Sequence, residues 1–353
     1  MKILVFTKNW LGDVLFEIPA LQALRENFPQ ARIVVLAPAR CQEILEAVPF
    51  IDEVRVFDER VSERSIPSKF RFVAWLRREK FNQVFLFHRS FTRAFLSLLG
   101  GIPERIGFET PKRRWVLTRP VSVPRGLVHQ VDYFLVLLKW AGLKVKFGAP
   151  YRFFYRAEDE VKAQHLVETS GLKEKSFAAF HLGANWKPKK WPAGHFLKLA
   201  ELVEKNFSCP VVLTGGTEEE SVAQELIEQT TRATRARLIS LCGKTSLGVL
   251  GALYQRAAFV VSSDSGPLHI ASGVGTPVVA LFGPTSPELT GPRGTGKKVV
   301  ISFILEGYTS PWFGKELPRG GWMEQITPET VFERILQENL WPQTKEKLFS
   351  PSR

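Results

Sequence analysis

Cysteine is scarce in this chain, and the spacing that binds metal ions is absent. The three cysteines, Cys41, Cys209 and Cys242, are scattered through 353 residues. No cluster of histidine, cysteine and carboxylate residues has metal-ligand spacing. Isolated cysteines are typical of a reducing compartment, where disulfides rarely persist. The sequence therefore predicts a cytoplasmic protein without a metal centre.

Long apolar runs are also missing. No segment approaches the roughly 18–20 consecutive apolar residues that a membrane-spanning helix needs, and the best candidate, Tyr133–Leu143, is interrupted by Lys139. The N-terminus leads directly into a strand pattern at Ile3–Thr7, without the apolar stretch and cleavage site of a signal peptide. We expect a soluble protein.

Three common site motifs do not occur. The first strand-to-helix turn, Lys8–Asp13, lacks the GxGxxG glycines, which argues against a dinucleotide wrapped around that turn. There is no GxSxG nucleophile elbow and no Walker A loop. If the protein binds a nucleotide, it does so by another pattern.

Positive charge is plentiful but uneven. The net charge is +13; residues 1–156 contain 26 Lys and Arg against 14 Asp and Glu, whereas residues 157–353 contain 22 against 21. This asymmetry favours a polyanionic partner for the first half, such as a nucleic acid, an anionic membrane or a phosphorylated lipid. A solvated basic face is the alternative. The clusters are Arg60 with Arg64, Arg77 and Arg78 with Lys80, and Lys112, Arg113 and Arg114 with Arg119 and Arg125.

Short β-rich runs alternate with helical patterns throughout. In the first half we expect strands at 3–7, 32–37, 53–57 and 83–87, helices at 13–27, 41–47, 68–78 and 129–143, and a basic proline-containing stretch at 102–128. In the second half we expect strands at 177–181, 211–214, 237–241, 259–261 and 278–282, and helices at 193–206, 218–231, 246–256, 267–272 and 329–339.

This alternation predicts an α/β fold of two Rossmann-like, doubly wound domains. We place them at residues 1–156 and 157–326, followed by a C-terminal helix and tail at 327–353. Two such domains are expected to face each other across a cleft, because ligands bind beyond the carboxyl ends of parallel strands.

The most specific pattern is the segment Phe259–Pro287. A buried-strand pattern leads into Asp264-Ser265-Gly266, then a helix that starts with Pro267, then a second buried strand. The first N–H groups of a helix have no partner within it, so they can bind an anion. The turn is therefore predicted to bind the phosphate of a ligand, with a carboxylate beside it.

Other loops could assist this site. In the loop 181–192, small residues at Gly183-Ala184 allow close backbone approach, and lysines including Lys189 supply charge for phosphate. Gly215-Gly216 would let a ring or ribose lie against the backbone. His269 lies one helical turn after Ser265. The plainer alternatives are a basic surface loop, an ordinary turn and a structural histidine.

Asp13 stands at the start of the first expected helix. It is either a capping or first-turn carboxylate, worth about 1 kcal/mol, or a general base that deprotonates a hydroxyl nucleophile.

These motifs converge on one family. Gly12-Asp13-Val14 followed by Pro19-Ala20-Leu21 resembles the opening of the bacterial ADP-heptose:lipopolysaccharide heptosyltransferases, glycosyltransferase family 9. Gly183-Ala184 with Lys189–Pro192, Asp264–His269 and Leu281–Pro287 resemble their later motifs, in the same order. The details look more like the second heptosyltransferase of the inner core than the first. Where many relatives have cysteines before the terminal helix, this chain has Trp312 and Trp322.

The resemblance implies a GT-B architecture and an inverting transfer of L-glycero-D-manno-heptose from ADP-heptose, with no metal or other cofactor. It implies that the C-terminal domain binds the donor. Asp13 is the implied base, Lys189 the group that neutralises the departing diphosphate, and Asp264 the residue that holds heptose hydroxyls. Ser265 and Gly266 with His269 would line the pyrophosphate end.

The N-terminal domain would then bind the acceptor, phosphorylated Kdo-lipid A or heptosyl-Kdo-lipid A. We expect the acceptor phosphates and carboxylates to meet Arg60, Arg64, Lys112, Arg113 and Arg114, and these residues to help hold the enzyme at the inner face of the cytoplasmic membrane.

Three alternatives stay open at this point. One is a transferase of the same fold with a different nucleotide sugar or acceptor. Another is a non-catalytic glycan- or nucleotide-binding relative, against which the joint presence of Asp13, Lys189 and Asp264 argues. A nucleic-acid-binding protein is the third, but the basic clusters lack interleaved aromatics and any known module, so we expect no nucleic acid.

Overall fold

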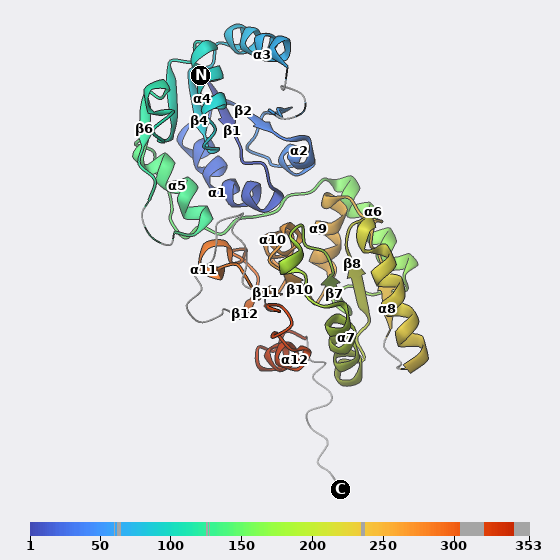
Figure 1. Cartoon of the computed structure of the whole chain (residues 1–353). Coiled ribbons are helices and arrows are strands. Elements are labelled where there is room, and N and C mark those ends of the chain that lie inside the picture. Colours follow the sequence, from blue (N-terminus) through green and yellow to red (C-terminus); the bar gives the residue numbers. More distant parts are fainter. Residues whose placement is uncertain are drawn as a thin grey trace. The chain divides into compact units, whose positions relative to one another are not determined.

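The chain forms two α/β units, each built on its own parallel sheet (Figure 1). In this computed structural model, unit 1 is Met1–Arg156 and unit 2 is Ala157–Arg353. The structure describes residues 1–59, 61, 65–124, 126, 128–233, 237–303 and 321–341. Arg60 and Arg64, two predicted acceptor contacts, lie outside the described residues, as do Trp312 and the tail after Trp341.

Unit 1 contains a six-stranded sheet. Its strands are β1 (Lys2–Phe6), β2 (Arg32–Ala37), β3 (Glu53–Val56), β4 (Gln83–Leu86), β5 (Glu104–Phe108) and β6 (Arg119–Val121). Its helices are α1 (Leu11–Asn27), α2 (Ala39–Glu46), α3 (Ile66–Glu79), α4 (Phe91–Leu99) and α5 (Gln130–Trp140), with a short 3-10 helix η1 (Arg114–Val116). The strand order β3-β2-β1-β4-β5-β6 places the topological switch point between β1 and β4.

Unit 2 repeats this arrangement. Its strands are β7 (Ala178–His181), β8 (Val211–Thr214), β9 (Leu238–Ser240), β10 (Phe259–Ser263), β11 (Val278–Phe282) and β12 (Lys298–Ser302). Its helices are α6 (Ala157–Thr169), α7 (Ala193–Phe207), α8 (Glu220–Ala233), α9 (Leu247–Arg256), α10 (Gly266–Gly273), α11 (Pro287–Thr290) and α12 (Pro328–Gln337), with 3-10 helices η2 (Lys187–Lys189) and η3 (Thr217–Glu219). The order β12-β11-β10-β7-β8-β9 puts its switch point between β7 and β10.

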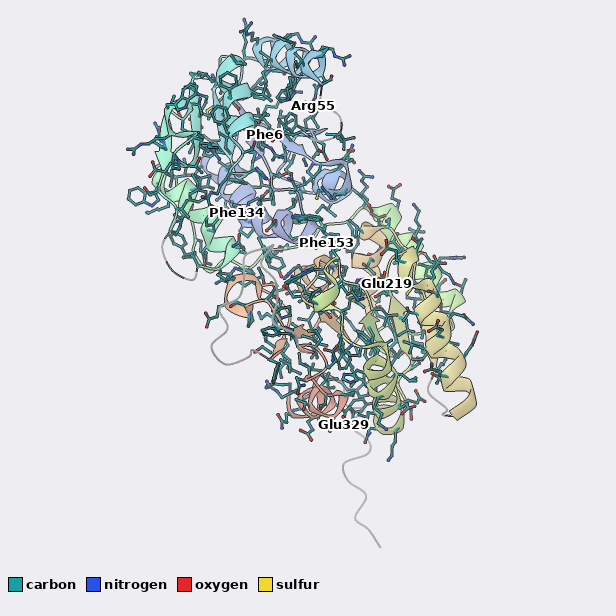
Figure 2. The ribbon with its side chains drawn as sticks, in the orientation of Figure 1. Phe6, Arg55, Phe134, Phe153, Glu219 and Glu329 are labelled. Atoms are coloured by element: carbon teal, nitrogen blue, oxygen red, sulfur yellow. The ribbon has the colours of Figure 1, made fainter. Side chains whose placement is uncertain are left out.

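The central strands are buried on both faces, as their continuous apolar sequences require. Every residue of β10 and β11 is buried. In unit 1, Leu4 and Phe6 of β1 belong to a core shared with α3 and α4. Phe6, labelled in Figure 2, lies in the upper part of that view. Its ring meets that of Phe57 edge-on, with centroids 5.2 Å apart. Rigid sheets of this kind hold the loops at their strand ends in fixed positions.

The predicted α/β class with two parallel sheets is confirmed, but several elements were missed. β5 and β6 lie inside the basic stretch 102–128, and β6 tolerates Pro120 because it is an edge strand. Strand β12 and the highly charged α6 were also missed, because neither shows a clean alternating or helical pattern. Helix α11 has only 4 residues, and α4 was missed although its apolar residues recur at helical spacing. No helix in the described part of the chain has both the length and the apolar character needed to cross a bilayer.

Candidate functional site

Four loops at the carboxyl end of the unit 2 sheet carry the candidate donor site. Gly183 follows β7, Gly215 follows β8, Asp264 follows β10 and Thr285 follows β11. Carboxyl ends of parallel strands meet at one edge of a sheet, and β7 and β10 border the switch point. The fold therefore gathers residues that are a hundred positions apart in the chain.

Asp264 is the centre of this cluster. Lys189 Nζ donates to its Oδ2 at 2.6 Å, the Thr285 hydroxyl donates to the same oxygen at 2.8 Å, and His269 Nε2 lies 3.6 Å from Oδ1. Burial alone would raise the pKa of Asp264, but His269 and the Lys189 charge outweigh it and hold that pKa far below its usual range. The carboxylate is therefore ionised and fixed in place.

Lys189 is positioned by the short helix η2 and by the residues after it. Two positions later, the buried indole of Trp191 donates to the carbonyl of Ile326 at 2.8 Å. This bond ties the loop to the segment just before α12. The Lys189 side chain keeps some solvent exposure, whereas its partner Asp264 is almost fully buried. The Lys189 ammonium group thus contacts the Asp264 carboxylate and is still accessible to a ligand.

The start of α10 lies directly after Asp264. Ser265 is the residue before the helix, and its side chain makes no capping bond; its Oγ lies 3.2 Å from Ser262 Oγ. Gly266 and Pro267 form the first turn. The free N–H groups of such a turn favour an anion. Ser265, Gly266 and the buried His269 therefore share one corner with Asp264, as the sequence predicts.

A second cluster surrounds Glu219, a residue that the sequence analysis missed. Its carboxylate accepts from the Gly216 N–H at 3.0 Å and pairs with Lys190 Nζ at 2.8 Å. A Cβ on Gly215 would lie 2.6 Å from Glu219 Cβ, and one on Gly183 would lie 3.2 Å from its Oε2. Figure 2 shows Glu219 beside β8 and α8. A side chain at position 215 would therefore displace Glu219, and one at position 183 would crowd it. The sequence signal for this residue was an acid three positions after Gly216.

Beneath Gly183, three buried polar side chains bond to one another. His181 Nδ1 lies 3.2 Å from both Thr214 Oγ1 and the Tyr254 hydroxyl, and those two oxygens lie 2.8 Å apart. Burial lowers the pKa of His181 to about 4, so the imidazole is neutral at physiological pH. The neutral, mutually bonded side chains of His181, Thr214 and Tyr254 therefore support the backbone where the loop after β7 begins.

In unit 1, Asp13 lies in the first turn of α1. The residue before the helix is Trp10, so the alternative in which Asp13 caps the helix is wrong, although a first-turn carboxylate still favours the helix dipole. One turn later, fully buried Glu17 accepts from the Lys8 N–H at 2.8 Å. Burial raises the pKa of Glu17 well above its usual value, the Lys8 hydrogen bond opposes the rise, and the Asp13 charge adds to it.

The loop that leads to Asp13 is held by buried Arg93 of α4. Its guanidinium donates to the Thr7 carbonyl at 2.5 Å, to Asn9 Oδ1 at 2.8 Å and to Glu59 Oε1 at 2.5 Å. These bonds join the loop after β1 to the helix after β4, on both sides of the unit 1 switch point. The loop that precedes Asp13 is therefore held in place by the Arg93 hydrogen bonds.

The structure separates the predicted acceptor residues. Lys112 and Arg114 are exposed, and Arg114 Nε lies 3.4 Å from Glu109. Arg113 is buried and donates to the His88 carbonyl at 2.9 Å, and burial lowers its pKa to about 10. Contact between these three residues and an acceptor stays a prediction.

No group of three or more His, Cys, Asp and Glu side chains able to hold a metal ion occurs among the described residues. A family model described as glycosyltransferase family 9 (heptosyltransferase) matches residues 69–319, a span that includes Lys189, Asp264 and Thr285. The chain belongs to glycosyltransferase family 9. The predicted family and enzyme class are thereby confirmed.

Relatives of this glycosyltransferase match it over almost its full length. Lipopolysaccharide heptosyltransferase 2 of Escherichia coli (strain K12) is 26% identical, over 95% of this chain and 97% of that protein. Among solved structures, a glycosyltransferase of family 9 from Veillonella parvula has a TM-score of 0.83 at 24% identity, covering 96% of this chain and 97% of the other. E. coli ADP-heptose lipopolysaccharide heptosyltransferase II has a TM-score of 0.77 at 25% identity, covering 96% and 100%. The GT-B fold and the likeness to the second heptosyltransferase are confirmed.

Proposed function

We propose that this enzyme transfers L-glycero-D-manno-heptose from ADP-heptose to the inner core of lipopolysaccharide. The observation that carries the proposal is the Lys189–Asp264 ion pair of 2.6 Å at the start of α10. It combines a cation for a diphosphate with a fixed carboxylate for sugar hydroxyls. Full-length similarity to heptosyltransferase 2 of E. coli supports the choice of donor and acceptor class.

Unit 2 supplies the donor-binding groups. Lys189 and the N–H groups that begin α10 would bind the diphosphate, and the ionised Asp264 would accept hydrogen bonds from heptose hydroxyls. The close backbone at Gly183, Ala184, Gly215 and Gly216 would admit the nucleoside, with Glu219 as an acceptor for its hydroxyls. Because Asp264 cannot readily take up a proton, it serves as a hydrogen-bond acceptor here rather than as the base.

The reaction itself is a displacement. An acceptor oxygen attacks the anomeric carbon from the face opposite the diphosphate, the bond to the diphosphate oxygen breaks, and ADP leaves with its electron pair. Because a nucleotide diphosphate is already a good leaving group, charge stabilisation by Lys189 and the helix N-terminus is the main requirement. The proton of the acceptor hydroxyl passes to Asp13, the proposed general base. No metal ion or other cofactor takes part in this scheme.

The acceptor is assigned to unit 1, whose sequence carries almost all of the excess positive charge. The exposed Lys112 and Arg114, together with Arg60 and Arg64, would contact the phosphates and carboxylates of Kdo-lipid A or heptosyl-Kdo-lipid A. This proposal places the enzyme in the cytoplasm, on the inner face of the membrane where such a lipid is exposed, and includes no nucleic acid.

The test measures ADP release from ADP-heptose with Kdo-lipid A, with heptosyl-Kdo-lipid A and with no acceptor. We expect release that depends on one of the two lipids, and a product heavier by one heptose. UDP-glucose serves as the control donor, followed by release of UDP, and should give none. Turnover of the control donor, or no release with either lipid, would contradict the proposal.

A further inference from the structure

Large hydrophobic side chains are exposed mainly on unit 1. In the part of the chain that the structure describes, all of the exposed large hydrophobic residues except Val161 and Leu336 belong to this unit. Scattered single residues of this kind are normal on a protein surface, whereas a contiguous group marks a contact site. Helix α4 and the neighbouring η1 carry such a group.

The group consists of Phe91, Phe95 and Leu99 on α4 and Trp115 on η1, and is called the aromatic patch. Phe91 and Phe95 stack with ring centroids 5.6 Å apart, and Trp115 lies 6.0 Å from Phe91 and 6.3 Å from Phe95. Phe91 is 38% exposed and Trp115 65% exposed. The two elements that carry these rings are in contact.

The patch has an inner and an outer part: Phe95 is half-buried against the core of unit 1, whereas Phe91 and Leu99 are exposed. Along α4, Phe91, Phe95 and Leu99 recur every four residues and so share one face of the helix, whereas Arg93, Ala94, Leu96 and Ser97 are its buried residues. A helix face that meets water is normally polar. Helix α4 therefore presents an apolar face outward in addition to its buried one.

Basic residues border the patch. Arg77 of the adjoining helix α3 donates from Nε to the Leu99 carbonyl at 3.0 Å, and exposed Arg78 follows it. Lys112 and Arg114 stand beside Trp115 in the chain, and the acidic group recorded there, Glu109, is already paired with Arg114. On α3, exposed Ile66 and Phe70 share the helix face of Arg77. The surface thus combines exposed rings with surrounding cations.

We infer that the aromatic patch docks on the surface of a bilayer that contains anionic lipids. Aromatic rings settle at the boundary between head groups and acyl chains, and long basic side chains bury their stems while their charges meet lipid phosphates. Each basic residue near such a surface adds attraction that salt weakens. The inference builds on the proposed lipid-linked acceptor and adds the particular face by which unit 1 meets the membrane.

The experiment compares sedimentation of the full-length protein with phosphatidylcholine vesicles and with vesicles that also contain phosphatidylglycerol. Wild type should bind the anionic vesicles, and Phe91→Ser/Trp115→Ser should bind them roughly tenfold or more weakly. Trp140→Ser is the matched control, because Trp140 is 74% exposed in the same unit but lies on α5. It should bind as wild type does. Arg77→Gln/Arg78→Gln should reduce the preference for anionic over neutral vesicles.

Transfer to a soluble, deacylated acceptor separates this inference from the proposed function. The Phe91→Ser/Trp115→Ser variant should keep wild-type ADP release with that acceptor while it loses vesicle binding. Unchanged vesicle binding overturns the docking inference, whatever the activity. So does a wild-type oligomer in solution that the same substitutions convert to a monomer, because a second copy would then cover the patch. Lack of transfer by wild type counts against the function alone.

Discussion

Lys189 Nζ lies 2.6 Å from Asp264 Oδ2, so the cation that we propose for a diphosphate is already engaged by a carboxylate. The pair is fixed by Thr285 and His269 on the Asp264 side and by the anchored Trp191 on the Lys189 side. Removing one partner from such a site leaves the other charge uncompensated. The two residues should therefore affect binding and catalysis together.

Lys189→Gln should lower kcat by about 10²- to 10³-fold, because charge on the departing diphosphate loses its main stabilising group. Affinity for ADP should fall as well. The measurement is steady-state ADP release together with calorimetric binding of ADP. Lys187→Gln is the control, because Lys187 lies on the same short helix η2 but is exposed. If the two variants had the same kcat and the same affinity for ADP, Lys189 would not be part of the donor site.

Asp13→Asn and Asp13→Ala should lower kcat by about 10²- to 10⁴-fold while ADP affinity stays near that of wild type. The reason is that the proposed base acts on the acceptor hydroxyl and belongs to unit 1, whereas the donor groups belong to unit 2. Glu329→Gln is the control, since Glu329 is also a first-turn carboxylate, on α12. Near-normal turnover would leave Asp13 only its helix-dipole role.

Gly215→Ala should weaken ADP binding, because the added methyl would lie 2.6 Å from Glu219 Cβ and displace that side chain and its bond to Gly216. Gly194→Ala is the matched control, because a Cβ there meets nothing within 4 Å and the residue lies in α7. Alanine also favours a helix over glycine. Isothermal calorimetry with ADP compares the two, and similar affinities would argue against the Glu219 cluster as part of the donor site.

Glu17→Gln should stabilise unit 1 more at pH 8 than at pH 5. The pKa of Glu17 is raised in the folded chain, so the folded state keeps a proton that the unfolded state releases. Stability from this group is present below its unfolded pKa and is lost as pH rises towards the folded value. Glutamine is neutral at both pH values and removes that loss. Urea unfolding measures the effect, and Glu26→Gln, on the exposed side of the same helix, should show no such difference.

His181 should make unit 2 less stable in acid. Its pKa is lowered to about 4, below the value of roughly 6.5 in an unfolded chain, so the unfolded state binds the proton first. The contribution of His181 to the free energy of unfolding is therefore complete above pH 6.5 and is lost as pH falls towards 4. The total loss is on the order of 3 kcal/mol. Hydrogen exchange of β7 across this pH range measures it. His181→Gln should flatten the profile, whereas His165→Gln, at an exposed position of α6, should not.

The elements that carry Asp264 were predictable because their residues are adjacent in sequence. A buried strand, an acidic turn and a helix that starts with proline define that corner within a few positions, and the predicted strand 278–282 matches β11. The contacts of Glu219 with Lys190 and of Thr285 with Asp264 could not be recognised in this way, since they arise only where separate loops meet. Arg113 shows the opposite case: three adjacent basic residues suggested one exposed cluster, yet the backbone turns the middle one into the core.

The two sheets share one strand order, and among the described residues no strand of one sheet pairs with a strand of the other. A chimera joined between Arg156 and Ala157 would therefore break no ladder of hydrogen bonds in either sheet. With the donor bound by unit 2 and the acceptor by unit 1, as proposed, the two preferences would change independently, by exchange or divergence of one half at a time. The architecture allows new pairings of sugar and acceptor to arise without redesign of either sheet.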